Sequence, residues 1–305
     1  ELRISLFLTP PQPSQPGLDA EGAAPPPKAG EVLALIQRLS LIEEILPTAE
    51  EARGGRADAV HIPLAGMAIG DGWIDPVNMI PAYPDMIYSF GLCDESEKAT
   101  IQQYCDRAVA LIKAGKMLEA FNVWDEFLNG DVWPYGNYFH NITGLNDYDN
   151  YLNTNAPADF DYYGRYLNQP AVQEAIHVTA AKVDDWQVCG SADGWDYTST
   201  RPNLPRDTYP LLVAHIRVLI YNGDWDACVP YTDNEAWTES MGYAAKEPWH
   251  AWSYDGNQVG GYATVYDTPH NFTFITVRGG RHEVPETQPQ RALHMFKALI
   301  SGGAF

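Results

Sequence analysis

The sequence predicts an α/β protein, and three features of its C-terminal half support that prediction. Residues 218–226 (VLIYNGDWD) form a short β-rich run that ends in a turn bearing carboxylates. Residues 272–285 (FTFITVRGGRHEVP) form a second strand that ends in a glycine-rich turn bearing a histidine. Residues 290–300 carry apolar side chains at helical spacing and close the chain. Strands that alternate with helices are typical of the α/β class.

The two strand-end turns lie in an informative order. A strand-end aspartate followed along the chain by a strand-end histidine matches the back half of an α/β-hydrolase triad, whose order is nucleophile, acid, histidine. His282 is the candidate general base, because a histidine titrates near neutral pH and a glycine-rich turn exposes it. Asp226 and Asp224 are the two candidates for the acid that orients the imidazole.

The front half of such a triad is not found. The sequence contains no Gly-x-Ser-x-Gly elbow, which would present a nucleophilic serine between a strand and a helix. Ser191, in the run CGSADG, lies in the segment most similar to that motif. It follows a predicted helix, however, and does not lie on a strand-to-helix elbow. We therefore expect this chain alone to be inactive, with its nucleophile missing.

Charge and composition exclude several classes of function. The chain of 305 residues has 40 acidic and 19 basic residues, a net charge of −21. We expect no nucleic-acid partner, because phosphate neutralisation needs clustered Lys and Arg. No run of about 18 apolar residues occurs, so no membrane span is expected. The histidines and cysteines lack zinc spacing, and the acidic pairs in 147–149 and 159–161 do not follow an EF-hand pattern, so neither metal nor cofactor is predicted.

Two sequons and four cysteines provide information on the cellular compartment of the protein. Asn141 and Asn271 begin Asn-x-Thr motifs and are candidate glycosylation sites if the chain is secreted. Asn271 opens a predicted strand, which favours Asn141. The cysteines are compatible with two disulfides or with free thiols, and Cys93 and Cys105, in one helix-rich region, are the candidate pair. The acidic charge fits a secreted or lysosomal/vacuolar protein, and it fits simple solubility equally well.

The chain changes character near residue 58. Residues 1–58 are a proline-rich leader without assignment, whose prolines exclude regular structure apart from a helix predicted at 31–46. Beyond residue 58 the pattern of apolar and polar residues is typical of a packed enzyme. The pattern predicts strands at 64–69, 217–221 and 272–277, helical periodicity over 95–128, a helix that starts at 169–170 with proline in its first turn, and helices at 210–215 and 290–300.

Several segments together resemble the serine carboxypeptidase family, and most closely its vitellogenic type. The resemblance covers about residues 60–305 and rests on motifs that occur in the family's order: GMAIGDGWIDP (66–76), FGLCD (90–94), NITG (141–144), YLNQPAVQEAIHV (166–178), GDWD (223–226), GGY (260–262) and GGRHEVP (279–285). Asp71 stands where the family usually has Asn.

The resemblance implies an α/β-hydrolase core that is incomplete at its N-terminal side and carries an inserted helical lid. It places the core at 59–77 and 166–305 and the lid at 78–165. It also implies that Asp226 is the acid and that Asp224 is a turn residue bonding backbone N–H groups. Cys189 resembles a family cysteine whose disulfide partner belongs to the missing front half. We therefore expect Cys189 to have no disulfide partner in this chain.

The implied function is a serine-type carboxypeptidase that removes C-terminal residues from peptides through an acyl-enzyme. This chain would supply Asp226 and His282, and a companion chain would carry the nucleophile. Two alternatives stay open. One is a catalytically inactive carboxypeptidase-like binding protein, and the other is an acyltransferase on the same scaffold, which differs only in its acceptor.

Overall fold

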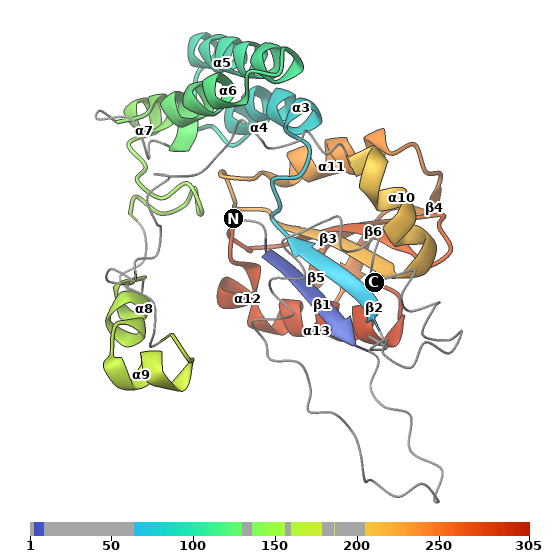
Figure 1. Cartoon of the computed structure of the whole chain (residues 1–305). Helices are drawn as coiled ribbons and strands as arrows, with labels where there is room; N and C mark the ends of the chain where they lie inside the picture. The colour runs from blue at the N-terminus through green and yellow to red at the C-terminus, as the bar shows by residue number, and fades with distance from the viewer. Residues whose placement is uncertain (1–2, 9–63, 130–135, 156–159, 179–185, 187–204) are drawn as a thin grey trace, which may run out of the picture. The chain divides into compact units, whose positions relative to one another are not determined.

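The computed structural model describes residues 3–8, 64–129, 136–155, 160–178, 186 and 205–305 (Figure 1). The chain divides into two compact units. The first consists of Glu1–Asp75, Asn203–Asp224 and Asn234–Phe305 and contains the sheet. The second consists of Pro76–Pro202 and Trp225–Asp233, and its described regular structure is helical.

The first unit is built on a six-stranded sheet in the order β1-β2-β3-β6-β5-β4. Strands β2, β3 and β6 are parallel, and antiparallel pairs flank them on both sides. This mixed sheet with helices confirms the predicted α/β class. The strands are β1 (Arg3–Leu8), β2 (Leu64–Gly70), β3 (Arg217–Gly223), β4 (Ala245–Ser253), β5 (Val259–Tyr266) and β6 (Phe272–Val277).

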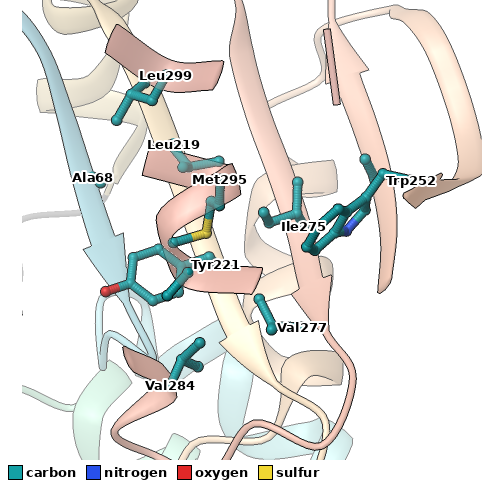
Figure 2. Packing of buried hydrophobic residues seen from close by; sticks show 11 residues of the cluster. Ala68, Leu219, Tyr221, Trp252, Ile275, Val277, Val284, Met295 and Leu299 are labelled. Atoms are coloured by element: carbon teal, nitrogen blue, oxygen red, sulfur yellow. The ribbon is translucent and has the colours of Figure 1, made fainter. Parts of the chain in front are cut away.

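The parallel strands form the core because most side chains along them are apolar. All six residues of β6 are buried, as are all residues of β3 after its first, which is typical of parallel strands covered on both faces. Helix α13 (Pro289–Ser301) packs on one face, where Figure 2 shows Met295 and Leu299 against Leu219 and Ile275.

Two further helices carry aromatic side chains toward the same sheet. Helix α10 (Pro205–His215) supplies Tyr209 and helix α11 (Tyr231–Ser240) supplies Trp237. The ring centroids of Tyr209 and Trp237 are 4.9 Å apart, and that of Trp237 lies 6.0 Å from Phe272 of β6. The predicted strands at 64–69, 217–221 and 272–277 and the helices at 210–215 and 290–300 are therefore confirmed.

The β4–β5 hairpin is an addition that the hydrophobic pattern did not predict. Strand β4 lies at the sheet edge and exposes most of its residues, but Trp252 is 1% exposed and its indole donates to the Thr276 carbonyl at 3.0 Å. Glycines 260 and 261 make room for this ring. A Cβ on Gly260 would lie 2.2 Å from the Trp252 ring, and one on Gly261 would lie 1.8 Å from the Thr276 carbonyl oxygen. These contacts explain the Gly-Gly pair before β6.

Strand β1 corrects one expectation from the sequence. The prolines of the leader suggested no regular structure there, yet Arg3–Leu8 pairs antiparallel with β2, with Ile4 opposite Ile69. The strand ends before the first proline, Pro10, so the two observations do not conflict. The pairing gives β2 a hydrogen-bonded neighbour on its outer side. The helix predicted at 31–46 lies outside the described residues.

The regular structure of the second unit is helical in the part of the chain that is described. Its longest helix, α5 (Glu95–Lys113), begins with a capping box. Asp94 Oδ1 accepts from the Glu97 N–H and Glu97 Oε2 accepts from the Asp94 N–H, both at 2.8 Å.

No described helix is both long and apolar enough to cross a membrane. The unit's elements are α3 (Pro76–Met79), η2 (Ile80–Ala82), α4 (Tyr83–Ser89), α5 (Glu95–Lys113), α6 (Met117–Trp124), the π-helical turn η3 (Asp125–Asn129), α7 (Tyr138–Thr143), α8 (Phe160–Leu167) and α9 (Pro170–Ala175).

The predicted Cys93–Cys105 disulfide is wrong, because both cysteines are free thiols. Cys93 precedes the N-cap of α5, whereas Cys105 lies in the interior of that helix. Ten residues of α-helix rise about 15 Å, and a disulfide needs Cα atoms about 4.4–6.8 Å apart. Cys105 is 2% exposed, and burial raises the pKa of its thiol. It serves as a small apolar core residue. Cys189 lies outside the described residues.

Candidate active site

The two turns predicted to carry chemistry follow neighbouring parallel strands. Strands β3 and β6 pair in a register that sets Gly223 opposite Val277, the last residue of each strand. Parallel strands end at the same edge of a sheet, and in open α/β sheets ligands bind outside the carboxyl ends of the strands. Asp226 follows the end of β3 by three residues, and His282 follows the end of β6 by five.

Within the first unit, the backbones at these two strand ends are in direct contact. A Cβ on Gly223 would lie 2.3 Å from the Gly280 carbonyl oxygen and 2.4 Å from that of Arg281. Only glycine fits there, since both obstacles are backbone atoms. This close approach explains the glycine of the GDWD motif on packing grounds.

Asp224 ties the two strand ends together. Its Oδ1 accepts the Gly279 N–H at 2.6 Å, and its own N–H donates to the Val277 carbonyl at 3.2 Å. The interpretation of Asp224 as a turn residue that binds backbone N–H groups is therefore confirmed. Burial raises the pKa of its carboxyl, and the bond from Gly279 opposes that rise.

Asp226 is 1% exposed and belongs to the second unit. Its Oδ1 accepts the N–H groups of Cys228 at 2.7 Å and Val229 at 3.1 Å, so the carboxylate is fixed by the turn that follows it. A buried carboxylate with one immobilised oxygen has the properties expected of the acid in a triad.

A buried tyrosine anchors the same turn from α4. Tyr83 is fully buried, and its hydroxyl donates to the Cys228 carbonyl and contacts the Asp233 carboxyl. Burial raises the pKa of both Tyr83 and Asp233 well above their ordinary values. The hydrogen bond with Tyr83 opposes part of the rise in the pKa of Asp233.

Asp71, noted in the sequence only as a departure from the family motif, has a definite structural role. It follows the end of β2 in the left-handed region, with φ of 47°, and is 1% exposed. Its N–H donates to the Tyr221 carbonyl at 2.8 Å, and its Oδ1 accepts from the Gly223 N–H at 2.9 Å and from Asn222 Nδ2 at 3.3 Å. Its position directly after a buried strand is the signal that could have identified it.

His282 lies in the turn between β6 and helix α12 (Val284–Thr287) and is partly exposed. Its two chain neighbours pair with each other, since Arg281 Nη2 lies 2.9 Å from Glu283 Oε2. The same guanidinium nitrogen lies 3.0 Å from Glu286 Oε2. Sequence reasoning missed this cluster, because charged residues beside a turn usually indicate a solvated surface.

The remaining predicted residues are placed as follows. Ser191 lies outside the described residues. Asn141 is exposed in α7, and its Nδ2 donates to the Gly136 carbonyl at 3.0 Å. Asn271 is partly exposed directly before β6, with φ of 59°, and its Oδ1 accepts from Lys246 Nζ at 3.3 Å.

The fold and the strand-end turns define an α/β-hydrolase. A family profile described as serine carboxypeptidase matches residues 41–302, and the chain belongs to that family. It is 34% identical over 252 residues to the human probable serine carboxypeptidase CPVL, covering 80% of this chain and 51% of that protein. It is 34% identical over 259 residues to the venom serine carboxypeptidase of Apis mellifera, covering 81% and 52% of the two chains.

A solved structure supports the fold. The Kex1Δp prohormone-processing carboxypeptidase from Saccharomyces cerevisiae aligns with a TM-score of 0.62 over 87% of this chain and 59% of that chain, at 19% identity. These comparisons confirm the family resemblance and the fold class. This chain spans about half the length of the curated relatives it matches.

Proposed function

We propose that this chain supplies the acid and the base of a serine carboxypeptidase that acts on peptides. The observation that carries the proposal is the order of Asp226 and His282 on turns that follow two neighbouring parallel strands, with Gly223 and Val277 in register. Family membership supports peptidase chemistry in general. The domain division into a core at 59–77 and 166–305 and a lid at 78–165 belongs to the same proposal.

In the proposed mechanism, His282 takes the proton from a serine hydroxyl as that oxygen attacks the scissile carbonyl. The protonated imidazole then gives this proton to the departing amine, which leaves an acyl-enzyme. Water then attacks the acyl-enzyme. His282 takes a proton from this water and gives it to the serine oxygen as that oxygen leaves. Asp226 holds the imidazole tautomer and stabilises the imidazolium, a role that suits a buried carboxylate fixed by backbone N–H groups.

The serine belongs, in this proposal, to a companion chain or a longer form of the protein. The chain alone would then be inactive, because a triad without its nucleophile retains only a small residual rate. A fluorophosphonate serine probe followed by intact mass analysis tests this on the purified chain and on native material. The proposal expects no adduct on this chain and one adduct on a companion chain or longer form in native material.

Two other outcomes of the probe experiment would overturn the proposal. An adduct on this chain would reveal an activated serine within it, and peptide mapping would locate that serine. No adduct in either sample would leave Asp226 and His282 without a nucleophile. An acyltransferase would also give an adduct, and transfer of an acyl group to an alcohol acceptor in place of water would distinguish it.

The second candidate function is a carboxypeptidase-like binding protein without activity. The pairing of β1 with β2 favours it, because this strand covers from within the chain an edge that an incomplete sheet would leave unpaired. A monodisperse monomer that binds a peptide but resists the probe would support this candidate. A chain that co-purifies with it and carries an elbow motif would exclude it.

We further propose that the protein is secreted or lysosomal/vacuolar and is glycosylated at Asn141, with Asn271 as the second site. The high acidic charge and the name of the venom relative support an extracellular or acidic compartment. Treatment of native protein with an N-glycosidase should lower its mass. Asn141→Gln should remove more of that difference than Asn271→Gln, because Asn141 is exposed and Asn271 is only partly so.

A further inference from the structure

Arg281 places a buried positive charge next to the candidate base. Its side chain is 1% exposed, and its Nη2 contacts Glu283 and Glu286 at 2.9 and 3.0 Å. Removing a guanidinium from water is costly, and a buried ion pair is weak evidence for stability. Buried ion pairs can instead be retained because they fix one conformation. Arg281 therefore calls for an explanation other than stability.

The ion pair closes a small loop around His282. Arg281 and Glu283 flank the histidine in the chain, so their contact joins the backbone on its two sides. The Arg281 N–H also donates to Thr287 Oγ1 at 3.2 Å, and Glu286 belongs to the same helix, α12. That helix is anchored in turn by Val284, which is 0% exposed in the core cluster shown in Figure 2.

These contacts fix both neighbours of His282 while its own side chain stays partly exposed. The Arg281 side chain is 1% exposed and that of Glu283 is 11% exposed, whereas Glu286 is the partner that lies nearer the surface. Both glutamate contacts come from one guanidinium nitrogen, Nη2, so a lysine ammonium would keep a donor for the glutamates but not the planar shape of the arginine side chain.

We propose that Arg281 is a positioning residue for His282, which it holds in one orientation through Glu283 and Glu286. The inference rests on the proposed function only in taking His282 as the base. The positioning itself is a property of this chain and is measurable without activity.

The test is an NMR experiment on the whole chain with isotopically labelled histidine. The signal of His282 is assigned among the eight histidines by its loss in His282→Gln. We expect one sharp ring signal for His282 in the parent protein. In Arg281→Met that signal should broaden or split into several, while the other histidines keep theirs, and Arg281→Lys should give an intermediate result.

Arg217 supplies the matched control. It begins β3 at the opposite end of the strand, and its Nη2 donates to the Ile300 carbonyl at 2.9 Å. Arg217→Met also removes an anchored guanidinium from the first unit, but it should leave the His282 signal sharp. If both arginine variants broaden that signal equally, the effect is general loosening and the proposal fails.

A folded Arg281→Met variant with an unchanged His282 signal would also overturn the proposal. If Arg281→Met does not fold, the folded Arg281→Lys variant decides by the same criterion. The outcome of the fluorophosphonate probe experiment does not depend on the outcome of the NMR experiment. A His282 signal that depends on Arg281, together with no labelled serine, would preserve the positioning role and remove the catalytic one.

Discussion

The acid turn (residues 224–233) and the histidine turn (residues 278–287) follow neighbouring strands but are held in different ways. In the acid turn, carboxylate oxygens of Asp224 and Asp226 accept backbone N–H groups, and the Tyr83 hydroxyl anchors the Cys228 carbonyl. In the histidine turn, the Arg281 guanidinium binds two glutamates. One turn depends on hydrogen bonds that neutral groups donate, and the other on a permanent charge.

The difference shows how each turn should respond to pH. Burial raises the pKa values of Asp224 and Asp233, the first and last residues of the acid turn. The folded state therefore retains protons that the unfolded chain releases. Arginine stays protonated at every relevant pH. The acid turn should therefore be most stable in acid, whereas the guanidinium of the histidine turn keeps its charge over the same range.

The largest expected effect comes from Gly223→Ala, which breaks the contact between the two strand ends. The new Cβ would meet the Gly280 and Arg281 carbonyl oxygens at 2.3 and 2.4 Å, and neither backbone atom can move aside cheaply. We expect a loss of about 3 kcal/mol in the free energy of unfolding, measured in urea. Gly164→Ala in α8, where a Cβ meets nothing within 4 Å, is the control and should be neutral or slightly stabilising. A loss below about 1 kcal/mol for Gly223→Ala would contradict the close packing of the two strand ends.

Asp233→Asn tests the pH dependence of the acid turn. Because the folded pKa of Asp233 is raised, its contribution is fully present below the ordinary aspartate value of about 3.9 and declines as pH rises toward the folded value. Within that window the parent should lose up to about 1.4 kcal/mol per pH unit from this group. The asparagine amide has nearly the same shape as the carboxyl, but it has no proton to lose.

The measurement is the free energy of unfolding of the parent and of Asp233→Asn between pH 4 and pH 7. The difference between the two should move in favour of the variant as pH rises. Asp85→Asn is the control, because the Asp85 side chain is 82% exposed beside Lys98 and such surface pairs contribute little. A difference that does not change with pH would mean that Asp233 is ionised in the folded protein.

The sequence predicted the parts of the fold whose signal is local. Residues 64–70, 217–223 and 272–277 are apolar runs that need burial on both faces, and they form the parallel centre of the sheet. Strand β4 was missed because its residues AKEPWHAWS are mostly exposed and mix polar with apolar side chains, and its strand conformation depends on pairing with β5. Strand β1 was missed for the same reason, since its partner β2 is about 60 residues away in the chain.

The same division applies to the candidate site. The strand-end positions of Asp226 and His282 follow from local pattern, whereas the contacts of Arg281 and Tyr83 depend on tertiary packing that no sequence spacing reveals. The Cys93–Cys105 prediction failed because proximity along the chain was mistaken for proximity in space. Asp224 is the instructive case, since its role as a turn residue was predicted but its partner, Gly279, lies 55 residues further along.

The smallest expected effect comes from Asp224→Ala, which sharpens the comparison by leaving every charge of the histidine turn intact. The Gly279 N–H would lose its acceptor at 2.6 Å, which should cost about 1 kcal/mol in the free energy of unfolding. Asp224→Asn retains an acceptor oxygen and should cost less. Because the pKa of Asp224 is raised by burial, the asparagine variant should also gain on the parent as pH rises above the ordinary aspartate value. If alanine and asparagine are equally costly at pH 4 and at pH 7, the bond to Gly279 is not what Asp224 contributes.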